Sequence, residues 1–300
     1  MATDANLRGV YVPIITPFAE DGSVAREALE RLCREYIDAG AAGIVALGTT
    51  GESTALDADE KHAVIDTCAR VCSERSAQLI VGAGTNNTRT TRQAVKELQG
   101  TPALVATLIV VPYYVRPSEG GIVAHFRSVA EVSPVPLVVY NISARTGRHL
   151  SAQNMHELAL TPNFAGVKHA PTSLDDDTLE LLRRTNDVDG FAVLGGTDTF
   201  LFPLVLMGGA GTICASAHVC TERFVAMIEC GLAGKVDEGR AHAEALLPVT
   251  QALFAEPNPA VFKGVLQAQG RIPTADVRLP LLNATPDAVE RALGAIAATS

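Results

Sequence analysis

Apolar and polar positions alternate in a regular order along almost the whole chain. Apolar runs of four to nine residues are each followed by a longer segment in which apolar residues recur every three or four positions. The first long segment, residues 24–39, places Leu29, Leu32 and Tyr36 on one helical face and is followed by Gly40, as expected for a helix with a glycine C-cap. The short runs are typical of buried strands, and the longer segments are typical of amphipathic helices.

This pattern predicts eight strands, each followed by a helix. The predicted strands are residues 9–15, 42–47, 78–83, 103–111, 136–140, 163–168, 191–194 and 211–215. The predicted helices are residues 24–39, 57–73, 88–99, 118–132, 151–160, 173–185, 197–207, 221–232, 235–254, 259–268 and 286–298.

Such an alternation is the pattern of an α/β protein of the (β/α)8 TIM-barrel class. We expect the barrel to occupy residues 1–220, and residues 221–300 to form C-terminal helices packed on it, with an appendage of about three helices. A doubly wound open sheet is the alternative fold. It is weakened because no Gly-x-Gly-x-x-Gly motif opens a helix after an early strand.

Composition narrows the class of protein. The chain has 300 residues, 47% of them hydrophobic and 19% charged, which is enough for one large core. Its net charge of -9 argues against nucleic acid and anionic membranes as partners. The N-terminus lacks an apolar signal core and no run approaches the ~18 apolar residues of a membrane span, so we expect a cytoplasmic protein. The six cysteines are irregularly spaced and predict no metal site.

One lysine stands out at the end of the sixth predicted strand. Phe164, Ala165 and Val167 lead into Lys168, so a barrel would place this ammonium at the carboxyl ends of the strands, where barrels carry their chemistry. Loss of solvent favours the neutral amine of a lysine and makes it available as a nucleophile. The alternative is that Lys168 extends to solvent, as most lysines at strand ends do.

Polar residues follow the other strands at the same predicted end of the barrel. Thr49 and Thr50 lie in a Gly-Thr-Thr-Gly turn, which is either an ordinary turn or a nest of backbone N–H groups and hydroxyls for a carboxylate. Tyr114 and Tyr140 follow or end strands four and five, and either pack in the core or relay protons. Arg145 is either a surface residue or a residue whose guanidinium binds a second carboxylate through two parallel hydrogen bonds. Together they predict a site for a substrate with carbonyl and carboxylate groups.

Several motifs in order along the chain resemble the dihydrodipicolinate synthase / N-acetylneuraminate lyase family. They are Gly-Thr-Thr-Gly-Glu-Ser at 48–53, Pro-Tyr-Tyr at 112–114, Tyr-Asn with Arg-Thr-Gly at 140–147, Gly-Val-Lys at 166–168, Gly-Gly-Ala-Gly-Thr-Ile at 208–213, Asn-Pro-Ala-Val-Phe-Lys at 258–263 and Val-Arg-Leu-Pro at 277–280. The resemblance implies a Schiff-base lyase or synthase that acts on pyruvate, is a homotetramer, and uses no metal or organic cofactor.

The resemblance also implies roles for individual residues. Lys168 would form the Schiff base, Tyr140 would be the general acid and base, and Thr49 would link Tyr140 to Tyr114 of a neighbouring subunit. The substrate-binding residues would be Thr50, Arg145, Ile213 and Gly196.

Arg145 and Thr49 favour the synthase branch, which condenses pyruvate with aspartate semialdehyde on the route to diaminopimelate and lysine. The chain departs from the synthase pattern at Ser143, His169, Thr197 and His218. A related pyruvate aldolase or dehydratase that acts on another 2-oxo acid or sugar acid therefore stays open. A non-catalytic metabolite-binding barrel and a phosphate-binding barrel are further alternatives, the second supported only by the glycine pairs at 195–196 and 208–209.

Overall fold

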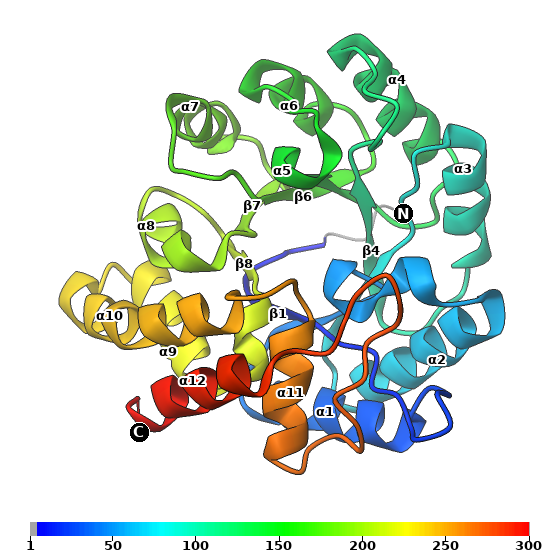
Figure 1. Cartoon of the computed structure of the whole chain (residues 1–300). Coiled ribbons are helices and arrows are strands. Elements are labelled where there is room, and N and C mark those ends of the chain that lie inside the picture. Colours follow the sequence, from blue (N-terminus) through cyan, green and yellow to red (C-terminus); the bar gives the residue numbers. More distant parts are fainter. Residues whose placement is uncertain (1–4, 300) are drawn as a thin grey trace.

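The computed structural model describes residues 5–299 and contains a closed barrel of eight parallel strands. Each strand pairs with the next along the chain, and β8 closes the barrel against β1. The strands are β1 (Gly9–Pro13), β2 (Gly43–Ala46), β3 (Gln78–Gly82), β4 (Leu104–Val110), β5 (Leu137–Asn141), β6 (Phe164–His169), β7 (Ala192–Gly195) and β8 (Gly211–Ile213). In Figure 1 they occupy the centre of the molecule, with helices around them. The predicted (β/α)8 barrel is confirmed, and the open-sheet alternative is wrong.

Helices follow the strands in the predicted order. They are α1 (Arg26–Asp38), α2 (Ala58–Glu74), α3 (Thr88–Glu97), α4 (Glu119–Ala130), α5 (Ser143–Thr146), α6 (Ala152–Ala159), α7 (Asp176–Thr185), α8 (Leu201–Leu206), α9 (Thr221–Leu232), α10 (Val236–Leu253), α11 (Ala260–Ala268) and α12 (Pro286–Ala297). Polar caps fix where several of them begin. Asp57 and Glu60 form a reciprocal capping box at α2, which satisfies backbone N–H groups that the first turn leaves free.

The core has two layers because successive strand residues point to opposite faces. One layer fills the barrel interior and includes Tyr11, Val45, Leu108 and Val138. The other lies between the strands and the helices and includes Val12, Ile44, Val139 and Val167. Burial on both faces explains why the strand sequences are apolar throughout.

The last helices cover one side of the barrel. α9 packs on β1 and β8 and also on α10, while α12 packs on α10 and α11. Because α9 contacts both the barrel and the later helices, the boundary that we expected after residue 220 stays a prediction. The segment between α11 and α12 crosses the front of the molecule beside α2 (Figure 1). Within residues 5–299, no helix is long and apolar enough to cross a membrane.

Candidate active site

The buried amine of Lys168 lies against an aromatic ring near the end of the barrel. Lys168 and Tyr140 are register partners on the adjacent parallel strands β6 and β5. Only 7% of Lys168 is exposed, and its Nζ lies 4.3 Å from the centroid of the Tyr140 ring. The alternative in which Lys168 extends to solvent is therefore wrong. The amine and the phenol ring are close enough to serve one substrate carbon framework.

Gly196 shapes the space beside this lysine. A Cβ atom at position 196 would lie 2.9 Å from Lys168 Cε and 3.0 Å from Lys168 Cγ. Both distances are shorter than a normal carbon–carbon contact. The glycine therefore leaves room for the lysine side chain. Ile213, at the end of β8, is buried in the barrel interior in the same apolar cluster as Tyr140.

The predicted carboxylate nest lies directly after β2. Thr49, Thr50 and Gly51 form a 3₁₀ turn, in which Thr50 is buried and Thr49 is half-buried. The amide of Asn258 donates to the Thr50 hydroxyl at 3.1 Å, and the Thr16 hydroxyl donates to the Gly51 carbonyl at 2.7 Å. The turn is thus held by residues that are remote from it in the sequence.

Tyr114 and Arg145 are exposed in the segments that follow β4 and β5. Tyr114 is 87% exposed and adopts a positive φ of 70° in the loop after β4. Arg145 is exposed on α5, which Gly147 ends in the left-handed conformation. The Arg148 guanidinium donates to the Arg116 carbonyl at 3.1 Å, which joins the two loops. Within residues 5–299, no hydrogen bond connects Thr49, Tyr140 and Tyr114, so the proton relay stays a prediction.

Asp198 is a charged neighbour of Lys168 to which sequence reasoning assigned no role. Its carboxylate accepts hydrogen bonds from the Ser216 backbone N–H at 2.7 Å and from the Cys214 thiol at 3.4 Å. Burial raises the pKa of Asp198, and the Ser216 hydrogen bonds and the Lys168 charge oppose that rise. The Gly-Gly-Thr-Asp sequence directly follows β7, where a barrel carries its chemistry, but the sequence does not identify the partners of this carboxylate.

Two of the residues that depart from the synthase pattern are histidines turned away from the site. His169 Nε2 lies 3.0 Å from the Thr178 hydroxyl on α7, and burial lowers the pKa of His169 to about 4. His218 accepts a hydrogen bond from the Ile15 backbone N–H at 3.1 Å through Nε2, and its Nδ1 donates to the Ala215 carbonyl at 2.7 Å. Both imidazoles therefore stabilise the fold around the barrel.

The other two departures lie shortly after strands β7 and β5. The Thr197 hydroxyl donates to the Pro171 carbonyl at 2.7 Å, which joins the loops after β7 and β6. Ser143 begins α5, and its carbonyl accepts from the backbone N–H of Gly147 at 2.9 Å. The hydroxyl of Thr197 is thus engaged by backbone, which weakens the argument that this departure changes the second substrate.

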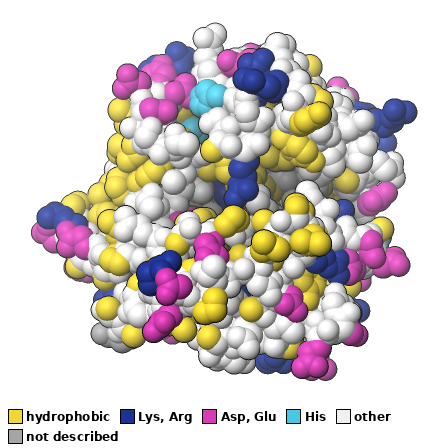
Figure 2. Space-filling view, viewed as in Figure 1, with side chains coloured by type: hydrophobic (Ala, Val, Ile, Leu, Met, Phe, Trp, Pro, Cys, Tyr) yellow, Lys and Arg dark blue, Asp and Glu magenta, His cyan; other side chains and the backbone are white. Residues whose placement is uncertain are grey.

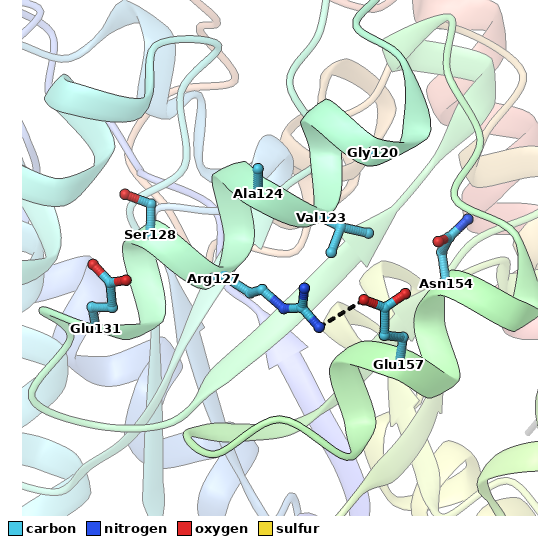
Figure 3. Close-up of a pocket in the computed structure, with 8 residues that line it drawn as sticks. All are labelled: Gly120, Val123, Ala124, Arg127, Ser128, Glu131, Asn154 and Glu157. Atoms are coloured by element: carbon cyan, nitrogen blue, oxygen red, sulfur yellow. Dashed lines mark ion pairs between the residues drawn. The ribbon is translucent and has the colours of Figure 1, made fainter.

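A separate groove lies on the outside of the barrel. It has a volume of about 440 Å³ and lies between α4 and α6, where Arg127 pairs with Glu157 at 2.6 Å (Figure 3). It is lined by helix residues and contains none of the strand-end side chains described above. In Figure 2 the face toward the viewer is instead hollowed near its centre, where Lys or Arg atoms border the hollow.

The donor set of the site contains no preformed metal centre. Among residues 5–299, no group of three or more His, Cys, Asp or Glu side chains could hold a metal ion. The reactive groups of the site are an amine, a phenol, hydroxyls and backbone N–H groups.

Comparison with known proteins gives the family. The model of the Dihydrodipicolinate synthetase family matches residues 6–298. The chain is 36% identical over 290 residues to a 4-hydroxy-tetrahydrodipicolinate synthase of Moorella thermoacetica, covering 97% of each chain.

Comparison with solved structures indicates the same family. A dihydrodipicolinate synthase variant described as monomeric superposes with a TM-score of 0.94 at 30% identity and covers 99% of this chain and 98% of its own. A chloride-inhibited dihydrodipicolinate synthase of Acinetobacter baumannii in complex with pyruvate superposes with a TM-score of 0.92 at 31% identity. The match covers 97% of this chain and 98% of that protein. The chain therefore belongs to the dihydrodipicolinate synthetase family.

Proposed function

We propose that the protein is a 4-hydroxy-tetrahydrodipicolinate synthase that condenses pyruvate with aspartate semialdehyde. The observation that carries the proposal is the buried amine of Lys168, 4.3 Å from the ring of Tyr140. An amine at the end of a barrel strand, beside a phenol, is suited to Schiff-base chemistry. The relatives named for this activity support the choice of substrates.

The reaction begins when the neutral amine of Lys168 attacks the ketone carbon of pyruvate and water leaves. The protonated imine that results withdraws electrons, so the neighbouring methyl group loses a proton and the iminium is converted into an enamine. The enamine carbon adds to the aldehyde of aspartate semialdehyde and forms the new carbon–carbon bond. The amine of the added substrate then displaces Lys168 and closes the ring.

Tyr140 transfers the protons of these steps, because its phenol ring lies 4.3 Å from the amine. Thr50, the backbone at Ile213 and the space beside Gly196 hold the pyruvate portion. Arg145 receives the carboxylate of aspartate semialdehyde through its planar guanidinium.

We also assign the protein a homotetrameric state in which Tyr114 reaches Thr49 of a neighbouring subunit. The 87% exposure of the Tyr114 side chain supports this assignment, because a large aromatic so placed is suited to a contact between subunits. Tyr114→Ala is expected to lower the condensation rate and shift the oligomer distribution in analytical ultracentrifugation. A variant with unchanged rate and mass would contradict the assignment.

The proposed location is the cytoplasm. All six cysteines are free thiols, which fits a reducing compartment. They are Cys33, Cys68, Cys72, Cys214, Cys220 and Cys230.

Borohydride reduction in the presence of pyruvate tests the Schiff base. Mass spectrometry is expected to find one pyruvyl unit on Lys168, to lose it in Lys168→Ala, and to keep it in Lys96→Ala, which changes an exposed lysine on α3. Pyruvate binding without covalent trapping would contradict the proposal.

The second substrate needs its own test. Pyruvate consumption is measured with aspartate semialdehyde and with a panel of other aldehydes, and pyruvate release is measured with sugar acids. Aspartate semialdehyde is expected to give the highest kcat/KM. A sugar acid with a higher value would assign the protein to a related aldolase.

A further inference from the structure

A buried ion pair links the turn after β2 to the C-terminal helices. Lys263 on α11 is completely buried, and its Nζ lies 2.5 Å from Glu52 Oε1. The two residues are 211 positions apart. Glu52 follows the Thr49–Gly51 turn directly and adopts the left-handed conformation with φ of 52°. The backbone that carries the two threonines thus ends at a fixed, charged contact.

Both charges of this pair have a full set of partners. The Lys263 ammonium also donates to the Asp276 carbonyl at 2.7 Å and lies 3.9 Å from the centroid of the Phe18 ring. The second oxygen of Glu52 accepts the Arg278 backbone N–H at 2.7 Å. A buried pair that is satisfied on both sides keeps one geometry, because any displacement leaves a charge without a partner.

The C-terminal region holds the same turn at a second point. Asn258, five residues before Lys263, donates to the Thr50 hydroxyl at 3.1 Å. The backbone N–H of Glu52 donates to the Thr49 carbonyl at 3.1 Å, which transmits the position of Glu52 to the turn. Two contacts from one C-terminal segment therefore hold the middle residue of a short turn and the residue that follows it.

Burial also disfavours the charged form of Lys263. It lowers the pKa of this lysine to about 8, and the negative charge of Glu52 opposes that change. Without Glu52 the ammonium would lose its ion-pair partner and keep only the charge of Asp276, which acts without a side-chain contact.

We propose that Lys263 and Glu52 are positioning residues that hold the hydroxyls and N–H groups of the Thr49–Gly51 turn in the geometry that binds the pyruvate carboxylate. The inference rests on the proposed function, since it names the turn as part of that site. Neither side chain needs to touch the substrate. The C-terminal helices thereby take part in substrate binding.

The first test compares Glu52→Gln, Lys263→Met and the double variant. The single variants are expected to raise the KM for pyruvate by about ten- to a hundredfold, because a small misplacement of binding groups is costly. Their thermal midpoint is expected to fall, because one buried charge is left alone. The double variant removes both charges, so its thermal midpoint is expected to recover toward that of the wild type while its KM stays raised.

Met155→Ala is the matched control, since it opens space in the core at α6 without touching the turn. It is expected to lower the thermal midpoint and leave the KM unchanged. If the double variant regains both stability and KM, or if the single variants lose only stability, the pair is merely structural and the inference is wrong.

Asn258→Ala provides a test that leaves no buried charge unpaired. It removes the hydrogen bond to Thr50 and is expected to raise the KM for pyruvate with little loss of stability. An unchanged KM for pyruvate would show that the hydrogen bond from Asn258 to Thr50 does not help to position the turn. Wild-type protein that is not trapped by pyruvate and borohydride would refute the proposed function itself, whereas trapping with unaltered KM values in all variants would refute the positioning inference alone.

Discussion

Gly196→Ala tests how closely the structure positions the amine of Lys168. The added Cβ would lie 2.9 Å from Lys168 Cε, whereas carbon atoms in contact are normally about 3.5–4.0 Å apart. The Cβ of Ala170, 3.0 Å from the same position, also limits the movement of the new methyl group. The lysine must therefore move by about 0.6 Å or more away from position 196.

A displacement of this size is expected to slow the reaction while the protein stays folded. Misplacement by about 1 Å can cost a hundredfold in rate, so we expect a ten- to hundredfold loss, or about 1.4–2.7 kcal/mol of activation free energy. The backbone at Gly196 is not in the left-handed region, so an alanine can adopt its conformation. The loss is expected in the rate of borohydride trapping as well as in kcat/KM.

Gly294→Ala is the matched control. Gly294 lies inside α12, and nothing lies within 4 Å of the position that its Cβ would occupy. The substitution is expected to raise the free energy of unfolding by about 0.5–1 kcal/mol, as alanine does in helix interiors, and to leave trapping unchanged. Wild-type trapping rates in Gly196→Ala would refute the steric reasoning, because the lysine would then have room that the structure denies it.

Three further predictions concern single side chains. Burial lowers the pKa of His218 to about 4, while the unfolded chain keeps a value near 6.5. Between these two pH values the unfolded state binds more protons than the folded state. The free energy of unfolding is therefore expected to fall by about 3 kcal/mol as the pH drops from 6.5 to 4. Urea unfolding across this pH range measures the loss, and His218→Gln should reduce the slope of the free energy of unfolding against pH. A urea midpoint that does not change with pH would contradict this prediction. Tyr140→Phe is expected to lower kcat by about a hundredfold or more with an unchanged thermal midpoint, as steady-state assays and calorimetry would show. Arg145→Ala is expected to raise the KM for aspartate semialdehyde and leave the KM for pyruvate unchanged; equal effects on both would contradict its assignment.

The strands and most helices were predictable because their signals are local. Each apolar run is buried on both faces, and each long segment presents one apolar stripe to the barrel. α5 was not predicted, because Ser143–Thr146 is too short to show a helical period. The position of Lys168 was also predictable, since a strand that ends at a lysine in a barrel places that lysine at the carboxyl ends of the strands.

Long-range pairing was not predictable from the sequence. The motif ending at Lys263 was recognised, but nothing in the pattern identifies Glu52 as its partner. Asp198 likewise follows a predicted strand, while its acceptance of the Ser216 N–H depends on how the loops after β7 and β8 approach each other. Such contacts depend on the packing of separate elements, which periodicity and local propensity do not specify.

The two halves of the proposed site are therefore held by different means. The Lys168–Tyr140 half is fixed by the hydrogen-bonded register of β5 and β6, which the closed barrel keeps rigid. The turn that begins at Thr49 lies beyond the end of β2, and its contacts come from Asn258, from Thr16 and, through Glu52, from the buried Lys263. Since a substrate must bridge both halves, we expect loss of the C-terminal contacts to weaken pyruvate binding even where the amine keeps its position.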